Sequence, residues 1–367
     1  MAIDTQNHGL IREGAGNAVL RPIPIPHLRD DYILVRTVTV ALNPTDWTTL
    51  DARGDDGTLV GCDYAGIVEE VGKAVKKPFK KGDRVAGFGH GGSRLIAMWQ
   101  IGNDANPENG AFARYIAVKG DIQMHIPDGV SFEAACTVGV GVATTGYALY
   151  HELGLPLPTL GTAGNISEEP EPILIYGGST ATGTIAIQFA KLSKLKVITT
   201  CSPKYFGMVK ELGADLVYDY HDTKVGDKIH ADTASKLKNV FDTVNVESSA
   251  VICADAIGPN GGMYCNLLGL DCPRQDVKSS FFLGYGISAE SYIFEGDEYE
   301  ARPQDFAFAS GFLELAERLW AEGKFKAHPQ RVGPGGLLGA IAGMQQMREG
   351  KVSGEKLVYL VEETQWP

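Results

Sequence analysis

The amino-acid sequence predicts an α/β fold that combines a β-rich domain with a doubly wound parallel-sheet domain. Short β-branched segments separated by glycines dominate residues 1–130. Strand-like and helix-like segments then alternate from residue 173 to residue 267. Such alternation is typical of a parallel sheet covered by helices on both faces. The length of 367 residues is enough for two domains of ordinary size.

Alternation of apolar and polar residues identifies the β-rich domain. Residues 31–42, with the sequence DYILVRTVTVAL, alternate in this way and predict strands. The segments GIVEEVG (66–72), GDRVAGF (82–88) and GAFARYIAV (110–118) predict further short strands between glycine turns. Small residues recur at helical spacing from residue 131 to residue 150, so a helical segment is expected to follow.

The parallel-sheet domain follows an exposed loop or linker, which the Pro-, Gly- and Glu-rich residues 153–172 predict. Strands are expected at 173–176, 196–200, 215–218, 239–244 and 261–267. Helices are expected between them, at about 181–192, 203–212, 225–237 and 248–257. Residues 270–305 show no regular pattern. The chain ends with helices expected near 305–322 and 336–348 and a strand at 355–361.

The composition excludes several classes of partner. The formal net charge of −12 argues against nucleic acids and anionic membranes, since both require a basic surface. No apolar run approaches the roughly 18 residues of a membrane-spanning helix. Residues 1–14 lack a signal-peptide pattern, so we expect a cytoplasmic protein.

Cysteine and histidine spacing predicts no metal site. The 6 cysteines include no C-x-x-C pair, and we expect them to be buried, reduced thiols. The 8 histidines include no H-x-x-x-H pair. Structural zinc sites usually combine such pairs, so none is expected here.

The segment ILIYGGSTATGTIAIQFAK (173–191) predicts a strand, a glycine turn and a helix. A dinucleotide-binding turn needs a tight bend, a close approach of backbone to pyrophosphate, and a helix N-terminus aimed at the anion. Gly177 and Gly178 can supply the bend, and Gly183 allows close packing of the helix on the strand. Three hydroxyl-bearing residues can reach phosphate oxygens: Ser179, Thr180 and Thr182. An ordinary βα turn without a nucleotide has the same pattern, so both interpretations stay open.

The second strand of this domain favours NADPH over NADH. An NAD site usually carries an acidic residue about 20 residues after the glycine turn, where it binds the ribose 2′-hydroxyl. Residues 184–210 contain no acidic residue. Ser202 and Lys204 suit a 2′-phosphate instead, although Ser202 and Pro203 also form a good N-cap and N1 pair for the next helix. Tyr220 can flank the same phosphate or the adenine, or it can be a half-buried tyrosine at a strand end.

Several motifs resemble those of the medium-chain dehydrogenase/reductase superfamily over nearly the whole chain. ALNPTDW (41–47) is similar to the N-P-x-D element of its quinone-oxidoreductase and enoyl-reductase branches. GCDYAGIVEEVG (61–72) is similar to its G-x-D-x-x-G-x-V-x-x-V-G element. Finer matches resemble the fungal trans-acting enoyl reductases, which are stand-alone NADPH enzymes. These matches are IYGGSTATGT, TTCSPKYF, VYDY, FDTVNVES, LGLPLP and KVSGEKLVYLV.

The resemblance implies a GroES-like catalytic domain formed by residues 1–145 and 310–367. It implies a Rossmann NADPH-binding domain formed by residues 146–309. The family members serve iterative polyketide synthases, or synthase–peptide synthetase hybrids. The expected reaction is therefore hydride transfer from NADPH to the β-carbon of an α,β-unsaturated polyketide thioester carried by a partner synthase.

The resemblance also implies catalysis without zinc. The zinc alcohol dehydrogenases of the superfamily carry a cysteine and a His-Glu pair at positions where this chain has Asn43, Cys62 and Asp63. One thiol and one carboxylate without histidine partners make a poor zinc site. Without a Lewis acid, reduction of a conjugated C=C bond is more plausible than oxidation of an alcohol.

The same resemblance implies roles for residues at matching positions. The nicotinamide side would be bordered by Thr45, Asp46, Trp47 and Thr48, by Leu267 and Leu268, and by Val352 and Ser353. The pyrophosphate would lie against Ser179, Thr180, Ala181 and Thr182. The adenosine phosphate would lie against Ser202, Pro203, Lys204, Tyr205 and Tyr220. The acyl substrate would lie along Thr145, Gly146, Tyr147, Ala148, Leu149, Tyr150, His151 and Glu152, and beside Gly284, Tyr285, Gly286, Ile287 and Ser288.

Thr48 and Thr144 are the candidate catalytic residues. The enolate formed by hydride addition needs a hydrogen-bond donor at its oxygen, which Thr48, Thr144 or a backbone N–H can supply. The α-carbon then needs a proton from Tyr147, Tyr285 or water, and each of these side chains can equally have a packing role. Relatives tend to read N-P-T-D-W-K, so Thr48 replaces a lysine; if that lysine anchors the carrier-bound thioester or the cofactor, one electrostatic contact is lost here.

Two other functions fit the same residues. One is a free-standing NADPH reductase of small quinones or enones, with no synthase partner. The other is a non-catalytic subunit that binds NADPH, which the absence of the lysine at Thr48 favours. We expect a monomer, because the insertion at 270–305 can block the sheet edge through which relatives often dimerise.

Overall fold

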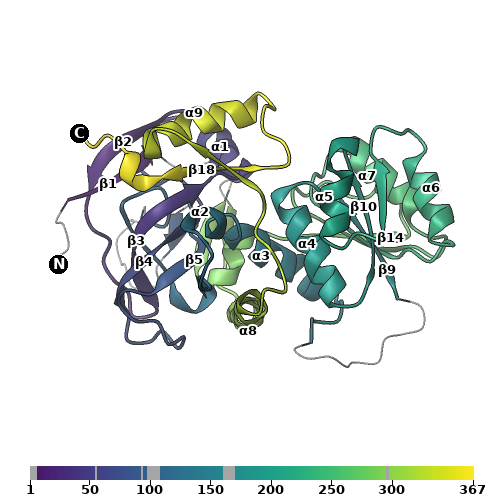
Figure 1. Ribbon diagram of the computed structural model, residues 1–367, viewed down its shortest axis with the longest axis horizontal. Coiled ribbons are helices and arrows are strands. Elements are labelled where there is room, and N and C mark those ends of the chain that lie inside the picture. The colour runs from purple at the N-terminus through teal and green to yellow at the C-terminus, as the bar shows by residue number, and fades with distance from the viewer. Residues whose placement is uncertain (1–5, 54–55, 92–93, 97–107, 160–169, 295–296) are drawn as a thin grey trace. The chain divides into compact units, whose positions relative to one another are not determined.

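The computed structural model describes residues 6–53, 56–91, 94–96, 108–159, 170–294 and 297–367 (Figure 1). The chain forms two compact units. The first comprises Met1–Val140, Tyr285–Ala321 and Ala327–Pro367, and the second comprises Gly141–Gly284 and Glu322–Lys326. The domain limits expected at 145/146 and 309/310 stay a prediction, since compact units need not end where family domains end.

The first unit is built on a seven-stranded sheet in the order β17-β18-β3-β4-β5-β8, with β7 paired to β3. Its strands are β17 (Gln330–Gly333), β18 (Lys356–Leu360), β3 (Tyr32–Ala41), β4 (Asp63–Val71), β5 (Arg84–Phe88), β8 (Met124–His125) and β7 (Tyr115–Lys119). An antiparallel pair is formed by β1 (Asn7–Arg12) and β2 (Ala18–Ile23). A three-stranded sheet contains β16 (Asp297–Tyr299), β15 (Ser291–Phe294) and β6 (Arg94–Ile96).

Helices of the first unit are mostly short. They are α1 (Pro44–Thr48), the π-helix η1 (Thr49–Arg53), α2 (Phe132–Ala135), α8 (Pro303–Ala321) and α9 (Gly336–Arg348). The 3₁₀ turns are η2 (Gly120–Ile122), η5 (Gly284–Ser288) and η6 (Val361–Glu363). The core packs the sheet against α9, through fully buried residues such as Tyr64, Leu337 and Met344. Helix α3 (Gly139–Gly146) and the π-helix η3 (Tyr147–Glu152) follow α2 along the chain and form the helical segment expected at 131–150.

The second unit is a six-stranded parallel sheet in the order β11-β10-β9-β12-β13-β14. Its strands are β11 (Leu216–Asp219), β10 (Lys196–Cys201), β9 (Pro172–Tyr176), β12 (Asn239–Asp242), β13 (Gly262–Asn266) and β14 (Val277–Phe281). The helices are α4 (Ala181–Leu192), η4 (Pro203–Tyr205), α5 (Phe206–Glu211), α6 (Val225–Asp232) and α7 (Glu247–Ala256), and Figure 1 shows them flanking the sheet. This strand order is that of the doubly wound dinucleotide-binding fold. The predicted fold class is confirmed.

Most predicted elements are confirmed, with three differences. The strand expected at 110–118 begins at Tyr115, and Ala113 makes an isolated bridge to Gly9. The helix expected at 225–237 ends at Asp232, because Ala234 and Ser235 take up left-handed conformations with φ of 49° and 60°. Residues 270–305, expected to be irregular, contain β15 and β16 and, before them, the parallel strand β14. The sequence hides this strand because just one of its residues, Val277, is buried.

Two expectations from composition can be compared with the structure. All 6 cysteines are free and buried, as the sequence predicted. Within the described residues, no helix combines the length and the apolar character that crossing a membrane requires.

Candidate functional site

The turn after β9 depends on glycine. Gly177 has φ of +84°, in the left-handed region. A Cβ atom on Gly183 would overlap the carbonyl oxygen of Gly177, and a Cβ on Gly178 would overlap the hydroxyl of Thr199. The three glycines therefore permit both the bend and the close approach of α4 to the sheet, as the sequence predicted from their spacing.

Thr180 is the N-cap of α4. Its Oγ1 accepts a hydrogen bond from the N–H of Gly183 at 2.9 Å and lies 3.0 Å from Oγ1 of Thr243, which follows β12. The Thr180 hydroxyl therefore already bonds within the turn, and a bound phosphate would have to share this hydroxyl with Gly183 and Thr243. In the described chain, no protein acceptor bonds the backbone N–H groups of three other turn residues: Ser179, Ala181 and Thr182. Such N–H groups at a helix N-terminus fit a pyrophosphate.

The residues predicted to hold the adenosine phosphate lie at the ends of adjacent strands. Ser202 follows β10 and is the N-cap residue of η4, with Pro203 at N1. Its hydroxyl makes no capping bond, so it stays available to a ligand. Lys204 is exposed, and its Nζ lies 4.7 Å from the ring centroid of Tyr205. Tyr220 follows β11 and is 40% exposed.

Asp219 was missed by the sequence argument, which covered residues 184–210 alone. The register of β10 and β11 places Asp219 opposite Cys201, next to the predicted phosphate site. The Asp219 carboxylate accepts a hydrogen bond from the His221 N–H at 3.0 Å and lies 2.7 Å from His221 Nδ1. These bonds lower the pKa of Asp219 below its ordinary value. The His221 ring also stacks on Tyr220, with centroids 4.0 Å apart.

Leu267 and Leu268 follow β13 at the carboxyl edge of the sheet. Leu267 is half-buried, whereas Leu268 is 60% exposed. The loop that carries them is bonded to the neighbouring loop after β12, through Asn245. In a doubly wound sheet, ligands bind at the carboxyl ends of the strands beside the point where the strand order reverses. Both loops lie at that edge.

In the first unit, α1 carries four of the residues predicted for the nicotinamide side. Asp46 is 3% exposed, and its Oδ2 accepts a hydrogen bond from the N–H of Asn43 at 2.6 Å. Its Oδ1 has no hydrogen-bond partner in the described structure. Burial, with a smaller contribution from the nearby Asp63 carboxylate, raises the pKa of Asp46 from 3.8 to about 7. Asp46 can therefore hold a proton near neutral pH.

Tyr285 lies close to α1 within the same unit. Its hydroxyl is hydrogen-bonded to Thr45 and Thr49, and burial raises its pKa above the ordinary value. The two threonine hydroxyls are 3.3 Å apart. The structure thus brings together Thr45, predicted for the nicotinamide side, and Tyr285, predicted for the substrate side. Their roles in binding stay predictions.

The other predicted residues of this unit have defined places. The Thr48 hydroxyl donates to the carbonyl of Thr45 at 3.4 Å. Trp47 and Val352 both pack on the core of the first unit, and Ser353 is exposed. Three of the residues after Tyr285 are buried in η5: Gly286, Ile287 and Ser288.

The predicted substrate residues of the second unit are largely buried. Thr144 is half-buried, and Thr145 is fully buried with an Oγ1 that has no hydrogen-bond partner in the described chain. The Tyr147 ring stacks on His151 with centroids 4.2 Å apart. The Tyr150 hydroxyl donates to the carbonyl of Phe189 at 3.2 Å, so it holds η3 on α4. The remaining members of this set are Gly146, Ala148, Leu149, Glu152 and Gly284.

A polar cluster occupies the positions where a zinc site was considered. Lys356 on β18 forms a buried ion pair with Asp63, and its Nζ donates to Asn43 Oδ1 at 2.8 Å. Asn43 Nδ2 donates to Asp63 Oδ2 at 2.9 Å. Burial raises the pKa of the Cys62 thiol well above its ordinary value. A zinc ion needs a thiolate and free carboxylate or imidazole ligands, so this donor set does not fit zinc.

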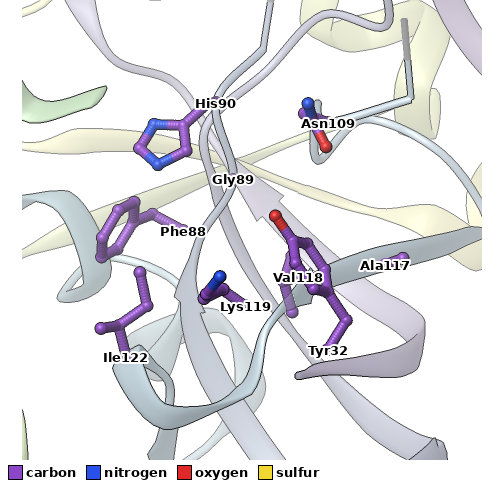
Figure 2. A pocket seen from close by; sticks show the side chains of 9 residues that line it. All are labelled: Tyr32, Phe88, Gly89, His90, Asn109, Ala117, Val118, Lys119 and Ile122. Atoms are coloured by element: carbon purple, nitrogen blue, oxygen red, sulfur yellow. The ribbon is translucent and has the colours of Figure 1, made fainter. Parts of the chain in front are cut away.

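Figure 2 shows a small pocket in the first unit, with room for about one water molecule. It is lined by Tyr32, Phe88, Gly89, His90, Asn109, Ala117, Val118, Lys119 and Ile122. No residue of the predicted site lines it, although the His90 ring lies 5.2 Å from that of Tyr285. The Lys119 Nζ is already bonded to Asp31 at 2.6 Å. We assign no part of the site to this pocket.

The sequence matches two protein families. Residues 29–128 match the alcohol dehydrogenase GroES-like domain, and residues 181–292 match the zinc-binding dehydrogenases. The chain is 44% identical over 355 residues to the trans-enoyl reductase ACTTS2 of Alternaria alternata, which covers 96% of this chain and 98% of that protein. It is 50% identical over 288 residues to the trans-enoyl reductase TOXD of Cochliobolus carbonum, covering 78% and 92%.

Solved structures share the fold. The CurK enoyl reductase superimposes with a TM-score of 0.72 at 19% identity, covering 97% of this chain and 99% of that chain. The quinone oxidoreductase from Coxiella burnetii gives a TM-score of 0.68 at 20% identity, with the same coverage of 97% and 99%. Enoyl reductases and quinone reductases therefore share this fold, so the fold does not distinguish between the two activities.

Proposed function

The chain belongs to the medium-chain dehydrogenase/reductases and, among them, to the trans-enoyl reductases, and on this premise we propose that it uses NADPH to reduce an α,β-unsaturated polyketide thioester. Similarity to named trans-enoyl reductases over 96% of the chain carries the proposal. NADPH, when bound, supplies the hydride that adds to the β-carbon. The residues of this chain bind and orient both molecules and complete the proton transfer.

The second unit supplies the groups that would hold the dinucleotide. The N–H groups of Ser179, Ala181 and Thr182 would bind the pyrophosphate at the N-terminus of α4. Ser202 and Lys204 would bind the 2′-phosphate, with Tyr220 beside it. A hydroxyl and an ammonium donate hydrogen bonds to a phosphate, whereas a carboxylate at this place would bond a ribose hydroxyl. These side chains support NADPH over NADH.

The first unit supplies the hydroxyl and carboxyl groups that would deliver the proton to the α-carbon. Tyr147 and Tyr285 were both considered as proton donors to the α-carbon. We favour Tyr285, because its hydroxyl bonds to Thr45, one of the residues predicted to border the nicotinamide. Asp46 lies nearby with a pKa raised to about 7 by burial, so it can exchange a proton near neutral pH. Thr48 and Thr144 remain the proposed hydrogen-bond donors to the enolate oxygen.

We propose that the reaction does not use zinc. Asp63 is bonded to the ammonium of Lys356, and the Cys62 thiol has a raised pKa. A metal ion at this place would have to displace a buried cation and deprotonate a buried thiol. The enolate charge would then be stabilised by hydrogen bonds.

We propose that the substrate arrives on the carrier of an iterative polyketide synthase or a synthase–peptide synthetase hybrid. The name trans-enoyl reductase, which the relatives carry, supports a separate synthase partner. We further propose that the protein is a cytoplasmic monomer. These finer statements are tested by co-purification with a synthase and by light scattering.

One assay tests the reaction. Purified protein is given NADPH with an α,β-unsaturated acyl-pantetheine or with a simple quinone, each with and without a metal chelator. We expect oxidation of NADPH with the acyl-pantetheine, unchanged by the chelator. Faster turnover of the quinone would favour the quinone reductase, which the similar fold of the Coxiella burnetii enzyme keeps as the second candidate. Tight binding of NADPH without turnover of either substrate would identify a non-catalytic subunit.

A further inference from the structure

Asn245 joins two loops at the carboxyl edge of the parallel sheet. It lies between β12 and α7 in a left-handed conformation with φ of 52°, and it is 4% exposed. Its Oδ1 accepts hydrogen bonds from the N–H groups of Leu268 and Leu270, both at 3.1 Å. Its Nδ2 donates to the Leu270 carbonyl at 3.1 Å and to the Tyr264 hydroxyl at 3.0 Å. One side-chain amide therefore fixes the loop after β13.

Asp242 fixes Asn245 in turn. The Asp242 side chain is fully buried, and its Oδ1 accepts hydrogen bonds from the N–H groups of Val244 at 2.9 Å and Asn245 at 2.8 Å. Its Oδ2 accepts from the hydroxyls of Ser249 at 2.6 Å and Tyr264 at 2.8 Å. The backbone and the side chain of Asn245 are thus both held by a fully satisfied buried network, which is rigid.

The loop that Asn245 holds exposes apolar side chains. Leu268 is 60% exposed and Leu270 is 37% exposed. A second amide supports the same loop, since Asn266 Oδ1 accepts from the Gly269 N–H at 2.7 Å. An ordered loop that presents leucines outward, at the edge where a doubly wound sheet binds its ligand, has the form of a binding surface.

The position of the 267–270 loop in the sheet indicates which part of the dinucleotide the loop would face. A doubly wound sheet consists of two mononucleotide-binding halves. Ser202 and Tyr220 lie in the half formed by β9, β10 and β11, which leaves the half formed by β12, β13 and β14 to the nicotinamide. Asn245 and Leu268 both lie in this second half.

We propose that Asn245 is a positioning residue: it fixes the 267–270 loop and thereby sets the orientation of the nicotinamide ring, without touching the ring itself. This inference rests on the proposed function. A misplacement of about 1 Å at a reacting centre can lower the rate about 100-fold. Release of the loop is therefore expected to lower kcat more than it weakens binding of NADPH.

The test compares Asn245→Gly with Asn239→Ala. Glycine keeps the left-handed backbone of position 245 and removes all four side-chain bonds. Asn239 is an equally buried asparagine at the opposite end of β12, where its Nδ2 donates to Glu171 at 2.9 Å. We expect N245G to lower kcat by about 10- to 100-fold and to change the Kd for NADPH by less than about threefold. N239A is expected to lower stability and to leave kcat unchanged.

A readout without cofactor accompanies the kinetics. Amide hydrogen exchange on the ligand-free protein should show faster exchange at Leu268 and Leu270 in N245G than in the wild type. Equal exchange in the two proteins, or a wild-type kcat in N245G, would overturn the inference. A loss of kcat no larger than that of N239A would also overturn it. If the wild type reduces no enoyl thioester, the proposed function fails, and the exchange result still decides whether Asn245 holds the loop.

A milder variant covers the case in which N245G does not fold. Tyr264→Phe removes the hydroxyl that accepts from Asn245 Nδ2 and keeps the buried ring. The change removes one of the four side-chain bonds of Asn245, together with the bond from the Tyr264 hydroxyl to Asp242, and we expect kcat to fall by about three- to tenfold. We also expect faster exchange at Leu270. An unchanged kcat together with unchanged exchange in Y264F would overturn the inference.

Discussion

Lys356 and Asp63 form an ion pair inside the β-rich unit, although β18 and β4 are separated by almost 300 positions in the chain. Their side chains are 3% and 0% exposed. Asn43 bonds to both partners, and the N–H of Val140 donates to Asp63 Oδ1 at 2.7 Å. The carboxylate thus has several hydrogen-bond donors, as a buried charge requires.

Removal of the cation should destabilise the protein strongly. We expect Lys356→Met to lower the free energy of unfolding by about 3–5 kcal/mol, because it leaves the Asp63 charge buried and unpaired. The double variant K356M/D63L should be less destabilised than K356M alone. Lys351→Met, at a side chain that is 67% exposed, serves as the control and should cost less than about 1 kcal/mol. Urea denaturation measures all three.

The raised pKa of Asp46 predicts a loss of stability as pH rises. The folded protein keeps the Asp46 proton up to about pH 7, whereas an unfolded chain loses it near the ordinary value of 3.8. The folded state therefore binds more protons between these values, and the free energy of unfolding falls as pH increases through this window. Asp46→Asn should remove this part of the slope. Urea denaturation at pH 5 and pH 8 measures it, with Asp128→Asn, an exposed position, as the control.

Gly183 should be intolerant of a side chain. A Cβ there would overlap the carbonyl of Gly177, so we expect Gly183→Ala to cost about 1–3 kcal/mol, as overpacking does. The displaced turn should weaken NADPH binding by about tenfold or more. Gly207→Ala on α5 is the matched control, because no atom lies within 4 Å of its Cβ position. It should bind NADPH normally and gain about 0.4–1 kcal/mol of stability.

Coenzyme preference should depend on Ser202 and Lys204. The double variant S202A/K204A is expected to raise the Kd for NADPH by about 10- to 100-fold. This is the change in affinity that the loss of hydrogen bonds to a charged phosphate produces. The Kd for NADH should stay near its wild-type value, since NADH has no 2′-phosphate. Fluorescence titration with both coenzymes measures this. An equal loss for the two coenzymes would contradict the assignment of these side chains to the phosphate.

His221 should control the effect of Asp219 on the same phosphate. His221→Ala leaves the Asp219 carboxylate without its imidazole partner, so we expect NADPH to bind about three- to tenfold more weakly, with little change for NADH. The double variant H221A/D219N should recover NADPH binding. If the double variant binds NADPH as weakly as H221A, charge at Asp219 is not the cause.

Features that depend on neighbouring residues could be predicted from the sequence. The turn at Gly177 and the helix that follows it are specified within about ten residues. The alternation of strands and helices predicts a parallel sheet with helices on both faces. Ser202, Lys204 and Tyr220 follow the ends of adjacent strands, as the local patterns indicate, and their role in cofactor binding stays a prediction.

Features that depend on contacts between distant residues could not be predicted. Asn245 stands in the motif FDTVNVES, but nothing near it in the sequence shows that its amide reaches Leu268 and Leu270. Lys356 was part of a C-terminal motif with no sign of its bond to Asp63. Likewise, Asp219 was not connected with Ser202, because strand register is a property of the sheet. In each case the role of the residue depends on a contact with a residue far away in the sequence, and the neighbouring residues do not reveal that contact.

The discontinuous first unit has a consequence for the order of folding during synthesis. Residues 141–284 of the second unit leave the ribosome as one uninterrupted stretch, well before β18 is made. The β-rich unit must wait for the last dozen residues of the chain, which bring the ammonium that neutralises its buried carboxylate. Until then it exposes unpaired strand edges on β3. The nascent chain therefore carries a nearly complete nucleotide-binding fold together with an unfinished sheet, whose unpaired strand edge favours aggregation.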